Sequence, residues 1–386
     1  MADFVFYNRT KVYFGMKKFS GLFHETGHYG KRILLVMGQG SVKKNGIYQR
    51  VMQEISDGFV VEEYSGIQTN PDVSLVNAGA SVCRQKKIEL IIALGGGSVI
   101  DCAKAIGVLA ASNTEDIRDI LSRKVAIENS IPVIAIPTTA ATGSEMNGGA
   151  VISDYQKKTK IGFGDEIMQP VCAFYVPEFT FTMTARQTAA SSADLICHIF
   201  DSGYFSRNGE MELLKSVQEG VLKTVIKTTY DALQKTDDLA ARENLLWSSS
   251  WALNGFMYQN IKQDNAVHII EHAISAYYPS IHHGLGIAII LPRWLQYISQ
   301  FDETREEINR FGANVLSIND GSIQKIIETF ANILYEDWKL PSHLRDFSVD
   351  ENSLSLIAND VGLHGKVSSI HNLSTKDILE IVKMSY

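Results

Sequence analysis

The sequence contains little cysteine and no motif that would use it. Its four cysteines, Cys83, Cys102, Cys172 and Cys197, are widely separated among 386 residues and show no Cys-x-x-Cys spacing. This distribution argues against a disulfide framework and against a thiolate zinc site. We expect all four to be reduced and to serve as small, buried hydrophobic residues.

Long apolar runs, a targeting signal and an excess of basic residues are also missing. No window approaches the roughly 18 uncharged apolar residues of a membrane span. The first four residues, Met-Ala-Asp-Phe, form neither a basic nor an apolar leader region. The formal net charge of -7 argues against nucleic acid or an anionic membrane surface as a partner. The sequence therefore predicts a cytoplasmic protein with no nucleic-acid or membrane partner.

The length and the spacing of apolar residues predict two domains. At 386 residues the chain exceeds the roughly 150 residues of one ordinary domain, and two domains sharing a cleft would suit a small-molecule enzyme. In residues 1–181, short apolar strands alternate with helical patterns, which is typical of a parallel sheet covered on both faces. We expect an α/β, doubly wound domain there. The expected strands are 33–37, 59–61, 88–94 and 132–137, and the expected helices are 72–86, 99–109 and a segment ending near Ile55.

Residues 182–386 have a different character, with helical spacing and few alternating β-branched residues. We expect an all-helical second domain, with helices over 185–208, 210–234, 239–257 and 266–278.

A glycine-rich loop follows the strand that ends near Leu94. Gly95, Gly96 and Gly97 precede Ser98, and an apolar helix with Asp101 in its first turn begins there. Glycines let backbone N–H groups approach an anion closely, and a helix N-terminus attracts negative charge. The alternative is a tight turn that binds nothing. We favour a phosphate-binding loop because three consecutive glycines are conformationally costly for a turn alone.

Two further loops carry groups suited to the same extended, anionic ligand. Residues 137–145 form a hydroxyl-rich loop after the next strand, although such hydroxyls more often cap helices. Residues 38–41, Gly-Gln-Gly-Ser, follow the first clear strand. The chain lacks the Gly-x-Gly-x-x-Gly pattern of an ordinary dinucleotide fingerprint. The candidate cofactor-binding residues of the three loops are Gly38, Gln39, Ser41, Gly95, Gly96, Gly97, Ser98, Asp101, Thr138, Thr139, Thr142 and Ser144, and we add Asn70.

Imidazole and carboxylate groups gather in two segments of the helical half. Asp194 and His198 stand four residues apart, as do His268 and His272, and the pair His282-His283 follows shortly after. Residues four apart share one helical face. Neutral imidazoles with a carboxylate suit iron(II) or zinc. Each residue also has a structural interpretation, since a lone helical histidine is more often a core or surface residue and Asp194 could act as a cap. The coincidence of all these groups favours a metal site.

Taken together, these motifs resemble those of the iron-containing, or group III, alcohol dehydrogenases. The Gly-Gly-Gly-Ser-x-x-Asp loop, the Pro-Thr-Thr-x-x-Thr-Gly-Ser-Glu loop, the Arg186-Gln187-Thr188-Ala189 segment and the His-x-x-x-His then His-Gly pattern occur in the family's order. The resemblance implies a homodimer of subunits with an α/β dinucleotide-binding domain and a helical metal-binding domain. It implies Asp194, His198, His268 and His283 as ligands of one divalent metal, Fe2+ or Zn2+, and adds Lys160 to the residues that line the cofactor.

The function that this resemblance implies is an NAD(P)-linked alcohol dehydrogenase or aldehyde reductase. We expect small aldehydes and primary alcohols as substrates, as in the butanol dehydrogenase-like branch. A polyol dehydrogenase of the glycerol or lactaldehyde type is the alternative. A lyase of the dehydroquinate synthase type would require a phosphate-recognising basic cluster around the metal, which the sequence does not show. His272 is the candidate catalytic residue, as a proton relay, although a structural hydrogen bond would explain it equally well.

The family pattern also bears on the choice of cofactor. Relatives restricted to NAD(H) typically carry an aspartate at the position of Gln39, where it accepts from the ribose 2′-hydroxyl and repels a 2′-phosphate. Gln39 brings no such repulsion, and Ser41 can donate to a phosphate. Lys43 or Lys44 would add positive charge, or would simply be solvated. We therefore expect NADP(H) to be preferred over NAD(H). Two departures from the family pattern are Val176, where many relatives have an aspartate before the proline, and Asn265 in place of a tryptophan. The second suggests an altered substrate pocket.

Overall fold

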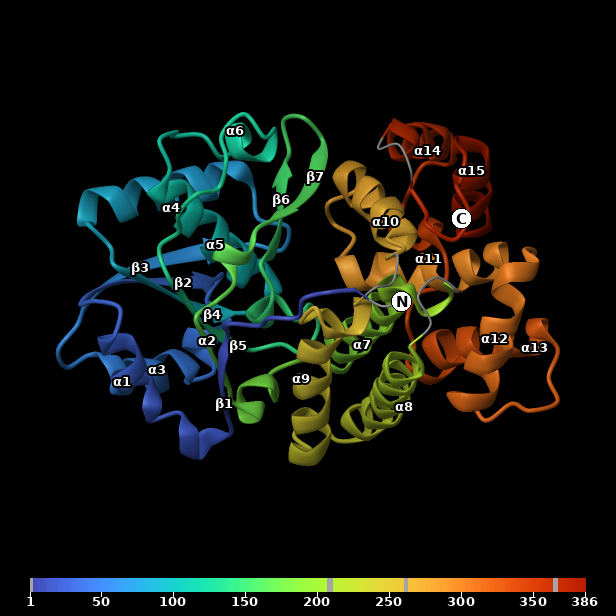
Figure 1. Cartoon of the computed structure of the whole chain (residues 1–386), viewed down its shortest axis with the longest axis horizontal. Helices are drawn as coiled ribbons and strands as arrows, with labels where there is room; N and C mark the ends of the chain where they lie inside the picture. The colour runs from blue at the N-terminus through green and yellow to red at the C-terminus, as the bar shows by residue number, and fades with distance from the viewer. Residues whose placement is uncertain (1–2, 207–210, 260–262, 364–366) are drawn as a thin grey trace. The chain divides into compact units, whose positions relative to one another are not determined.

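The computed structural model describes residues 3–206, 211–259, 263–363 and 367–386 (Figure 1). The chain divides into two compact units, one of residues 7–183 and one of residues 1–6 together with 184–386. The first unit is an α/β unit, and the described secondary structure of the second is entirely helical. The predicted fold class is therefore confirmed. None of the helices in the described part of the chain is long and apolar enough to cross a membrane.

A six-stranded parallel sheet with the strand order β1-β8-β5-β4-β2-β3 forms the centre of the α/β unit. Strands β2 to β5 are the ones that the sequence predicts. The edge strand β1 and its neighbour β8 are absent from the prediction because each has only four residues, too few to show a pattern. The strands are β1 (Lys11–Phe14), β2 (Arg32–Gly38), β3 (Val60–Ile67), β4 (Leu90–Gly95), β5 (Val133–Pro137) and β8 (Cys172–Tyr175).

Both faces of the sheet are covered because successive residues of a strand point to opposite sides. On one face, Ile33, Leu35 and Met37 of β2 join a core with residues of the first three helices. On the other face α5 packs on β4 and β5, and α4 packs on α5 (Figure 1). This double coverage explains the continuously apolar strands of the sequence. The helices are α1 (Gly21–Gly27), α2 (Ser41–Lys44), α3 (Ile47–Ile55), α4 (Val73–Lys86), α5 (Gly97–Ala111) and α6 (Ile117–Leu121).

The register of the strands places the predicted loops at one edge of the sheet. Met37 pairs with Leu94, and Gly95 pairs with Pro137. The loops that follow β2, β4 and β5 therefore all begin at the same height. All these strands are parallel, but the chain adds them in opposite directions from the centre: β3 lies on the outer side of β2, and β5 lies on the outer side of β4. The strand order therefore reverses between β2 and β4. Such a reversal is where doubly wound sheets bind their ligands.

A two-stranded antiparallel hairpin, β6 (Gly149–Asp154) and β7 (Thr159–Gly164), lies beside the main sheet and packs on α5. The prediction lacks this hairpin. β6 and β7 are short and contain three glycines between them, so neither shows a clear strand pattern. The hairpin matters for the site because Lys160 is on β7.

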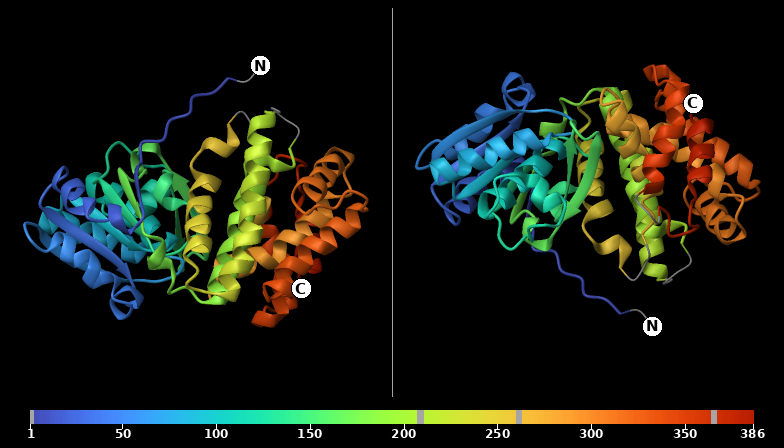
Figure 2. Two further views of the ribbon diagram at one scale, coloured as in Figure 1. Left: turned by 90° about the horizontal axis from the view of Figure 1, so that it is seen from below. Right: turned by 90° about the horizontal axis from the view of Figure 1, so that it is seen from above.

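The second unit is a set of packed helices, and α8 and α9 lie side by side in both views of Figure 2. The predicted helices are present, but the first and third end earlier than predicted. After Ile199 the chain forms a π-helical turn (Phe200–Tyr204) in which Gly203 has a φ of 85°, and Gly255, with a φ of 92°, follows the end of α9. The predicted end of the first helix at 208 and the predicted start of the second at 210 lie outside the described residues. The helices are α7 (Ala185–Ile199), α8 (Glu212–Gln234), α9 (Leu239–Leu253), α10 (Ala266–Tyr277), α11 (His283–Ile298), α12 (Asp302–Asn314), α13 (Ile323–Asn332), α14 (Leu354–Leu363) and α15 (Thr375–Met384).

All four cysteines are free and buried, as the sequence predicts. Burial raises the pKa of Cys83 to about 12, and it has the same effect on Cys172 and Cys197. Thiols held in this state are poor nucleophiles. They therefore act as apolar core residues.

The surroundings of two helical glycines predict opposite effects on stability when each is replaced by alanine. A Cβ atom at Gly79 of α4 would lie 2.4 Å from Cδ1 and 2.8 Å from Cγ1 of the buried Ile106, whereas a Cβ at Gly220 of α8 would meet nothing within 4 Å. We expect Gly79→Ala to lower the melting temperature, because overpacking costs about 1–3 kcal/mol and exceeds the gain in helix propensity. Gly220→Ala should raise it, since alanine is favoured over glycine by about 1 kcal/mol in a helix. Thermal unfolding followed by circular dichroism measures both, and equal shifts would contradict the prediction.

Candidate functional site

Asp194 and His198 occupy the buried side of α7. The helix begins with a capping box, in which the Thr184 hydroxyl accepts from the Gln187 backbone N–H while the Gln187 side chain accepts from the Thr184 N–H. This cap defines the start of the helix. The spacing of four residues then places the His198 Nε2 3.4 Å from the Asp194 Oδ1.

His268 and His283 approach the same carboxylate from two other helices. The Nε2 of His268, in the first turn of α10, lies 3.3 Å from Asp194 Oδ1, and the Nε2 of His283, the first residue of α11, lies 3.4 Å from it. The rings of His198 and His268 are stacked with their centroids 4.5 Å apart. Three imidazole Nε2 atoms therefore surround one carboxylate oxygen, which is the donor set that iron(II) or zinc accepts.

Gly284 allows His283 to reach this position. A Cβ atom at Gly284 would lie 2.3 Å from the backbone oxygen of Ala190 in α7. Only glycine lets the start of α11 approach α7 this closely. His282, the residue before, is the N-cap of α11 and is exposed. Of the two adjacent histidines, His283 is thus the one that joins the cluster.

The electrostatics of Asp194 and His198 match the protonation states that a metal requires. Burial alone would raise the pKa of Asp194, but His198, His283 and the hydrogen bond from His268 hold that pKa well below its usual range. Burial lowers the pKa of His198 to about 3. An ionised carboxylate and a neutral imidazole are the forms that bind metals. At His268 burial would lower the pKa, but Cys197, Asp201 and Asp194 raise it well above its usual range, so an ion that binds there must displace a proton.

Two buried carboxylates beside the cluster are absent from the sequence prediction. Asp201 contacts the Nδ1 of His268, and Glu271 contacts the Nδ1 of His283. Each stands three residues after a histidine of the cluster, at His198-x-x-Asp201 and His268-x-x-Glu271. This spacing of about one helical turn is the signal that could have identified them.

His272, the predicted catalytic residue, is half-buried at the side of the same cluster. Its ring centroid lies 5.4 Å from that of His283 and 6.2 Å from that of His268. One of its ring nitrogens lies within 4.8 Å of a carboxylate oxygen of Glu271 and of a ring nitrogen of His283. The structure therefore places this imidazole beside the cluster without making it one of the three that surround Asp194.

In the α/β unit, the glycine loop and the hydroxyl loop pack directly on one another. Gly96 is the N-cap of α5 and offers no side chain to the first amides of the helix. A Cβ at Gly96 would lie 2.9 Å from Thr139 Oγ1, and one at Gly97 would lie 2.4 Å from Thr142 Oγ1. The first amides of an α-helix have no partner within the helix. An anion can therefore be bound at this helix start.

Asp101 and Ser144 are directed toward each other. The Ser144 hydroxyl donates to Asp101 Oδ1 at 2.5 Å, and the backbone N–H of Val151 donates to Oδ2 at 2.9 Å. Burial raises the pKa of Asp101 against the opposing charges of Lys104 and Lys160. These two predicted cofactor residues therefore tie the hydroxyl loop and the hairpin to α5.

Asn70 follows β3 at the same edge of the sheet and adopts a left-handed conformation with a φ of 57°. Its backbone oxygen accepts from the Tyr155 hydroxyl at 2.7 Å. Its side-chain Nδ2 is buried without a hydrogen-bond partner in the described part of the chain. A buried donor of this kind can donate to an acceptor on a ligand or to a water.

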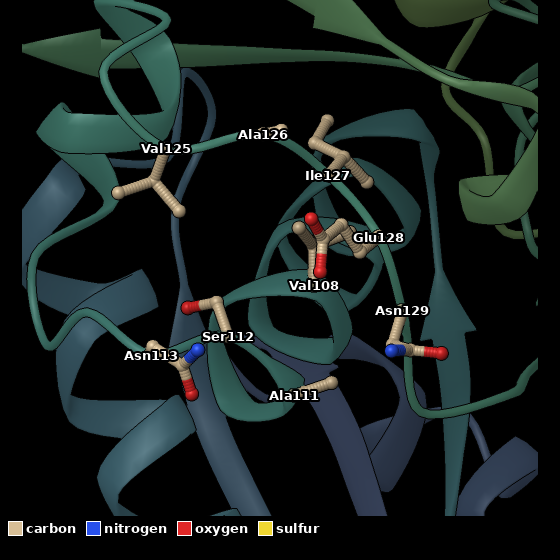
Figure 3. Close-up of a pocket in the computed structure, with 9 residues that line it drawn as sticks. All are labelled: Val108, Ala111, Ser112, Asn113, Val125, Ala126, Ile127, Glu128 and Asn129. Atoms are coloured by element: carbon tan, nitrogen blue, oxygen red, sulfur yellow. The ribbon is translucent and has the colours of Figure 1, made fainter.

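The loop with Gln39 and Ser41 borders a cavity of about 290 Å³. Both side chains are exposed, and Lys43 also lines the cavity. The Lys43 Nζ donates to Glu63 Oε2 at 2.5 Å, so part of its charge is already compensated. A second cavity, of about 200 Å³, lies at the far end of α5 between Ala111 and Ile127 (Figure 3). None of the predicted site residues lines that second cavity.

Comparison with known proteins identifies one family for both halves of the chain. Residues 9–177 match the family model described as iron-containing alcohol dehydrogenase, and residues 188–386 match the C-terminal model of the Fe-containing alcohol dehydrogenase family. The chain is 36% identical over its full length to the full length of NADH-dependent butanol dehydrogenase A of Clostridium acetobutylicum. It is 30% identical to NADPH-dependent aldehyde reductase YqhD of Escherichia coli, covering 95% of this chain and 94% of that one. The crystal structure of NADH-dependent butanol dehydrogenase A from Thermotoga maritima superposes with a TM-score of 0.94 at 34% identity, covering 100% of this chain and 99% of that one.

Proposed function

The chain belongs to the iron-containing alcohol dehydrogenase family, and from this premise we propose that it reduces small, largely apolar aldehydes to primary alcohols with a nicotinamide cofactor and one divalent metal. Alcohol dehydrogenase or aldehyde reductase activity is the function of its relatives. The single observation that carries the proposal is the cluster of three imidazole Nε2 atoms around one oxygen of the buried Asp194.

The residues present fit both groups that the family implies. Asp194, His198, His268 and His283 would hold the metal through one carboxylate oxygen and three imidazoles. The start of α5 with Gly95, Gly96, Gly97 and Ser98, the loop with Thr138, Thr139 and Thr142, and the unpartnered Asn70 amide would hold the cofactor. When bound, the metal supplies Lewis acidity toward the substrate oxygen, and the nicotinamide supplies or accepts the hydride. We propose that His272 exchanges the proton of the substrate oxygen.

The substrate class is tested by following nicotinamide absorbance with a panel of aldehydes. We expect kcat/KM to be highest for butyraldehyde and similar apolar aldehydes, because no arginine clamp for a charged substrate is evident among the described residues. The chain is also 27% identical to the lactaldehyde reductase of Escherichia coli, with 93% of this chain covered. Lactaldehyde and polyols therefore belong in the panel. A preference by orders of magnitude for phosphorylated or carboxylated aldehydes would contradict this substrate assignment.

The proposed metal site predicts one divalent ion per chain. Asp194→Ala should abolish metal binding and turnover, because it removes the oxygen around which the imidazoles gather. The ion would be measured by plasma emission spectroscopy of the purified protein, and thermal unfolding would show that the α/β unit remains folded. Full activity in a demonstrably metal-free preparation would rule the site out.

His272→Ala is the matched control for that experiment, since it removes an imidazole from the same cluster that is not a proposed ligand. This variant should retain the ion while turnover falls. If the ion is lost as well, His272 is a ligand. If turnover is unchanged, His272 has only a structural role.

For the cofactor we propose that NADP(H) is preferred and that NAD(H) is still used. Gln39 lines the 290 Å³ cavity and carries no charge that would repel a 2′-phosphate, and Ser41 in the same loop is exposed. One charge-assisted hydrogen bond contributes about 1.5–3 kcal/mol, which would favour NADPH roughly ten- to a hundredfold. The pairing of Lys43 with Glu63 reduces what that lysine can add. Named relatives include both NADH- and NADPH-dependent enzymes.

Steady-state kcat/KM for both cofactors tests this proposal. Gln39→Asp should shift the preference toward NADH, because the new carboxylate repels the 2′-phosphate. Glu63→Gln should shift it further toward NADPH, because it frees the charge of Lys43. A tenfold or greater preference of the unmodified protein for NADH would overturn the assignment.

We also propose that the chain forms a homodimer in the cytoplasm, with a nucleotide-binding domain over residues 1–181 and a metal-binding domain over residues 182–386. Phe4, Val5, Phe6 and Tyr7 are 44%, 89%, 43% and 71% exposed. This apolar segment leads into β1, which is an edge strand of the sheet. Exposed apolar segments next to an open strand edge are typical of protein interfaces. The four buried thiols suit a reducing compartment.

A further inference from the structure

His268 and His283 each contact two carboxylates, one at either ring nitrogen. The Nε2 atoms face Asp194, while the Nδ1 of His268 contacts Asp201 Oδ2 and the Nδ1 of His283 contacts Glu271 Oε2. The side chains of Asp201 and Glu271 are only 7% and 0% exposed. Both carboxylates therefore lie on the side of the ring away from the proposed metal.

This arrangement determines which nitrogen of each ring carries the proton. A carboxylate only accepts hydrogen bonds when ionised, so each Nδ1 donates its proton to Asp201 or Glu271. Nε2, which hydrogen-bonds to Asp194 while no ion is bound, is then the nitrogen whose lone pair becomes available when an ion displaces its proton. Ring orientation is set by the same contacts. The two outer carboxylates thus prepare both histidines as ligands before any ion arrives.

The surrounding chain holds both carboxylates in place. The hydroxyl of Ser275, one turn along α10, donates to Glu271 Oε1 at 2.7 Å. A Cβ at Gly286 of α11 would lie 2.8 Å from Glu271 Cγ, so the space for Glu271 depends on a glycine. Asp201 lies in the π-helical turn that follows α7, and its backbone oxygen accepts from the Asp264 N–H at 2.8 Å. Its second carboxylate oxygen is buried without a hydrogen-bond partner among the described residues.

The pairing is selective among the three imidazoles. His198 is on the same helix as Asp194, so helical spacing alone aligns it. His268 and His283 come from α10 and α11, so helical spacing does not align their rings with Asp194; His268 stacks on His198, and each ring has a further contact at Nδ1. Within the described ranges, those are the two histidines of the cluster that have an outer carboxylate.

We propose that Asp201 and Glu271 are positioning residues that set the affinity of the cluster for its metal ion. This inference rests on the proposed function, because it assumes that the ion binds at Asp194, His198, His268 and His283. Each outer carboxylate fixes the tautomer of one histidine and increases the electron density at its Nε2. The charge of the three carboxylates also exceeds that of a divalent ion by one, which favours retention of the cation.

The test measures binding of cobalt(II) alone, by competition with a chromophoric chelator and by the visible absorption of the bound ion. Asp201→Asn and Glu271→Gln keep the shape of the side chain and remove its charge. We expect each variant to bind cobalt 10- to 100-fold more weakly, as is typical when an outer partner of a metal-bound histidine is changed. The visible bands should shift in both variants, because the ligand field at Nε2 changes.

Glu219→Gln is the matched control for the loss of a buried carboxylate. Glu219 is in the same unit, its side chain is 8% exposed, and it pairs with Arg310 rather than with a histidine. Removing its charge should lower the melting temperature and leave the cobalt affinity unchanged. An equal loss of affinity in this variant would mean that the effect is general destabilisation, and the inference would be overturned.

The outcomes separate this inference from the proposed function. If Asp194→Ala binds cobalt as tightly as the unmodified protein, the metal site itself is wrong. If Asp194→Ala loses cobalt while Asp201→Asn and Glu271→Gln bind it normally, the site stands and the inference fails. Should both amide variants fail to fold, Ser275→Ala takes their place, because it removes only the hydroxyl that holds Glu271. A several-fold loss of affinity there supports the inference, and unchanged affinity overturns it.

Discussion

The helical unit depends on the convergence of three imidazoles on the buried carboxylate of Asp194. This carboxylate is one residue of α7, yet the rings that face it come from α7, α10 and α11. A buried negative charge is costly unless it is compensated. The helices that bring histidines to it must therefore be held accurately. Gly284 contributes directly, since it lets α11 begin against the backbone of α7.

The same requirement explains why the metal cluster extends beyond its ligands. Asp194 contacts His268 and His283 at Nε2, and His268 also stacks on His198. Asp201 and Glu271 add a contact on the outer side of each ring. The π-helical turn after α7 also becomes understandable, because it places Asp201 beside His268 where a continued α-helix would direct residues differently. Such turns are frequent at functional sites.

In the α/β unit, the equivalent constraint is the register of the parallel strands. Because Met37 pairs with Leu94 and Gly95 with Pro137, three loops that are far apart in sequence start at one edge of the sheet. Because these loops pack closely, their residues have different contacts. Gly96 and Gly97 lie against Thr139 and Thr142, while Asp101 is engaged by Ser144 and Val151. Residues of one motif thus differ in role, some available to a ligand and others holding the loops together.

Local patterns in the sequence were sufficient for the fold class, for strands β2 to β5 and for the helices α7 to α10, because apolar periodicity and glycine positions act over short distances. Spacing of four residues also paired Asp194 with His198 and His268 with His272, because such spacing is a property of a single helix. The resemblance to the family, and not spacing, implied Asp194, His198, His268 and His283 as one ligand set. Spacing could not show that His283 rather than His282 joins Asp194, that Asp201 and Glu271 contact the outer nitrogens, or that Lys43 pairs with Glu63. The sequence patterns also did not indicate the short strands β1 and β8 or the hairpin of β6 and β7. Each of these features depends on contacts between segments distant in sequence, and only the tertiary structure brings those segments together.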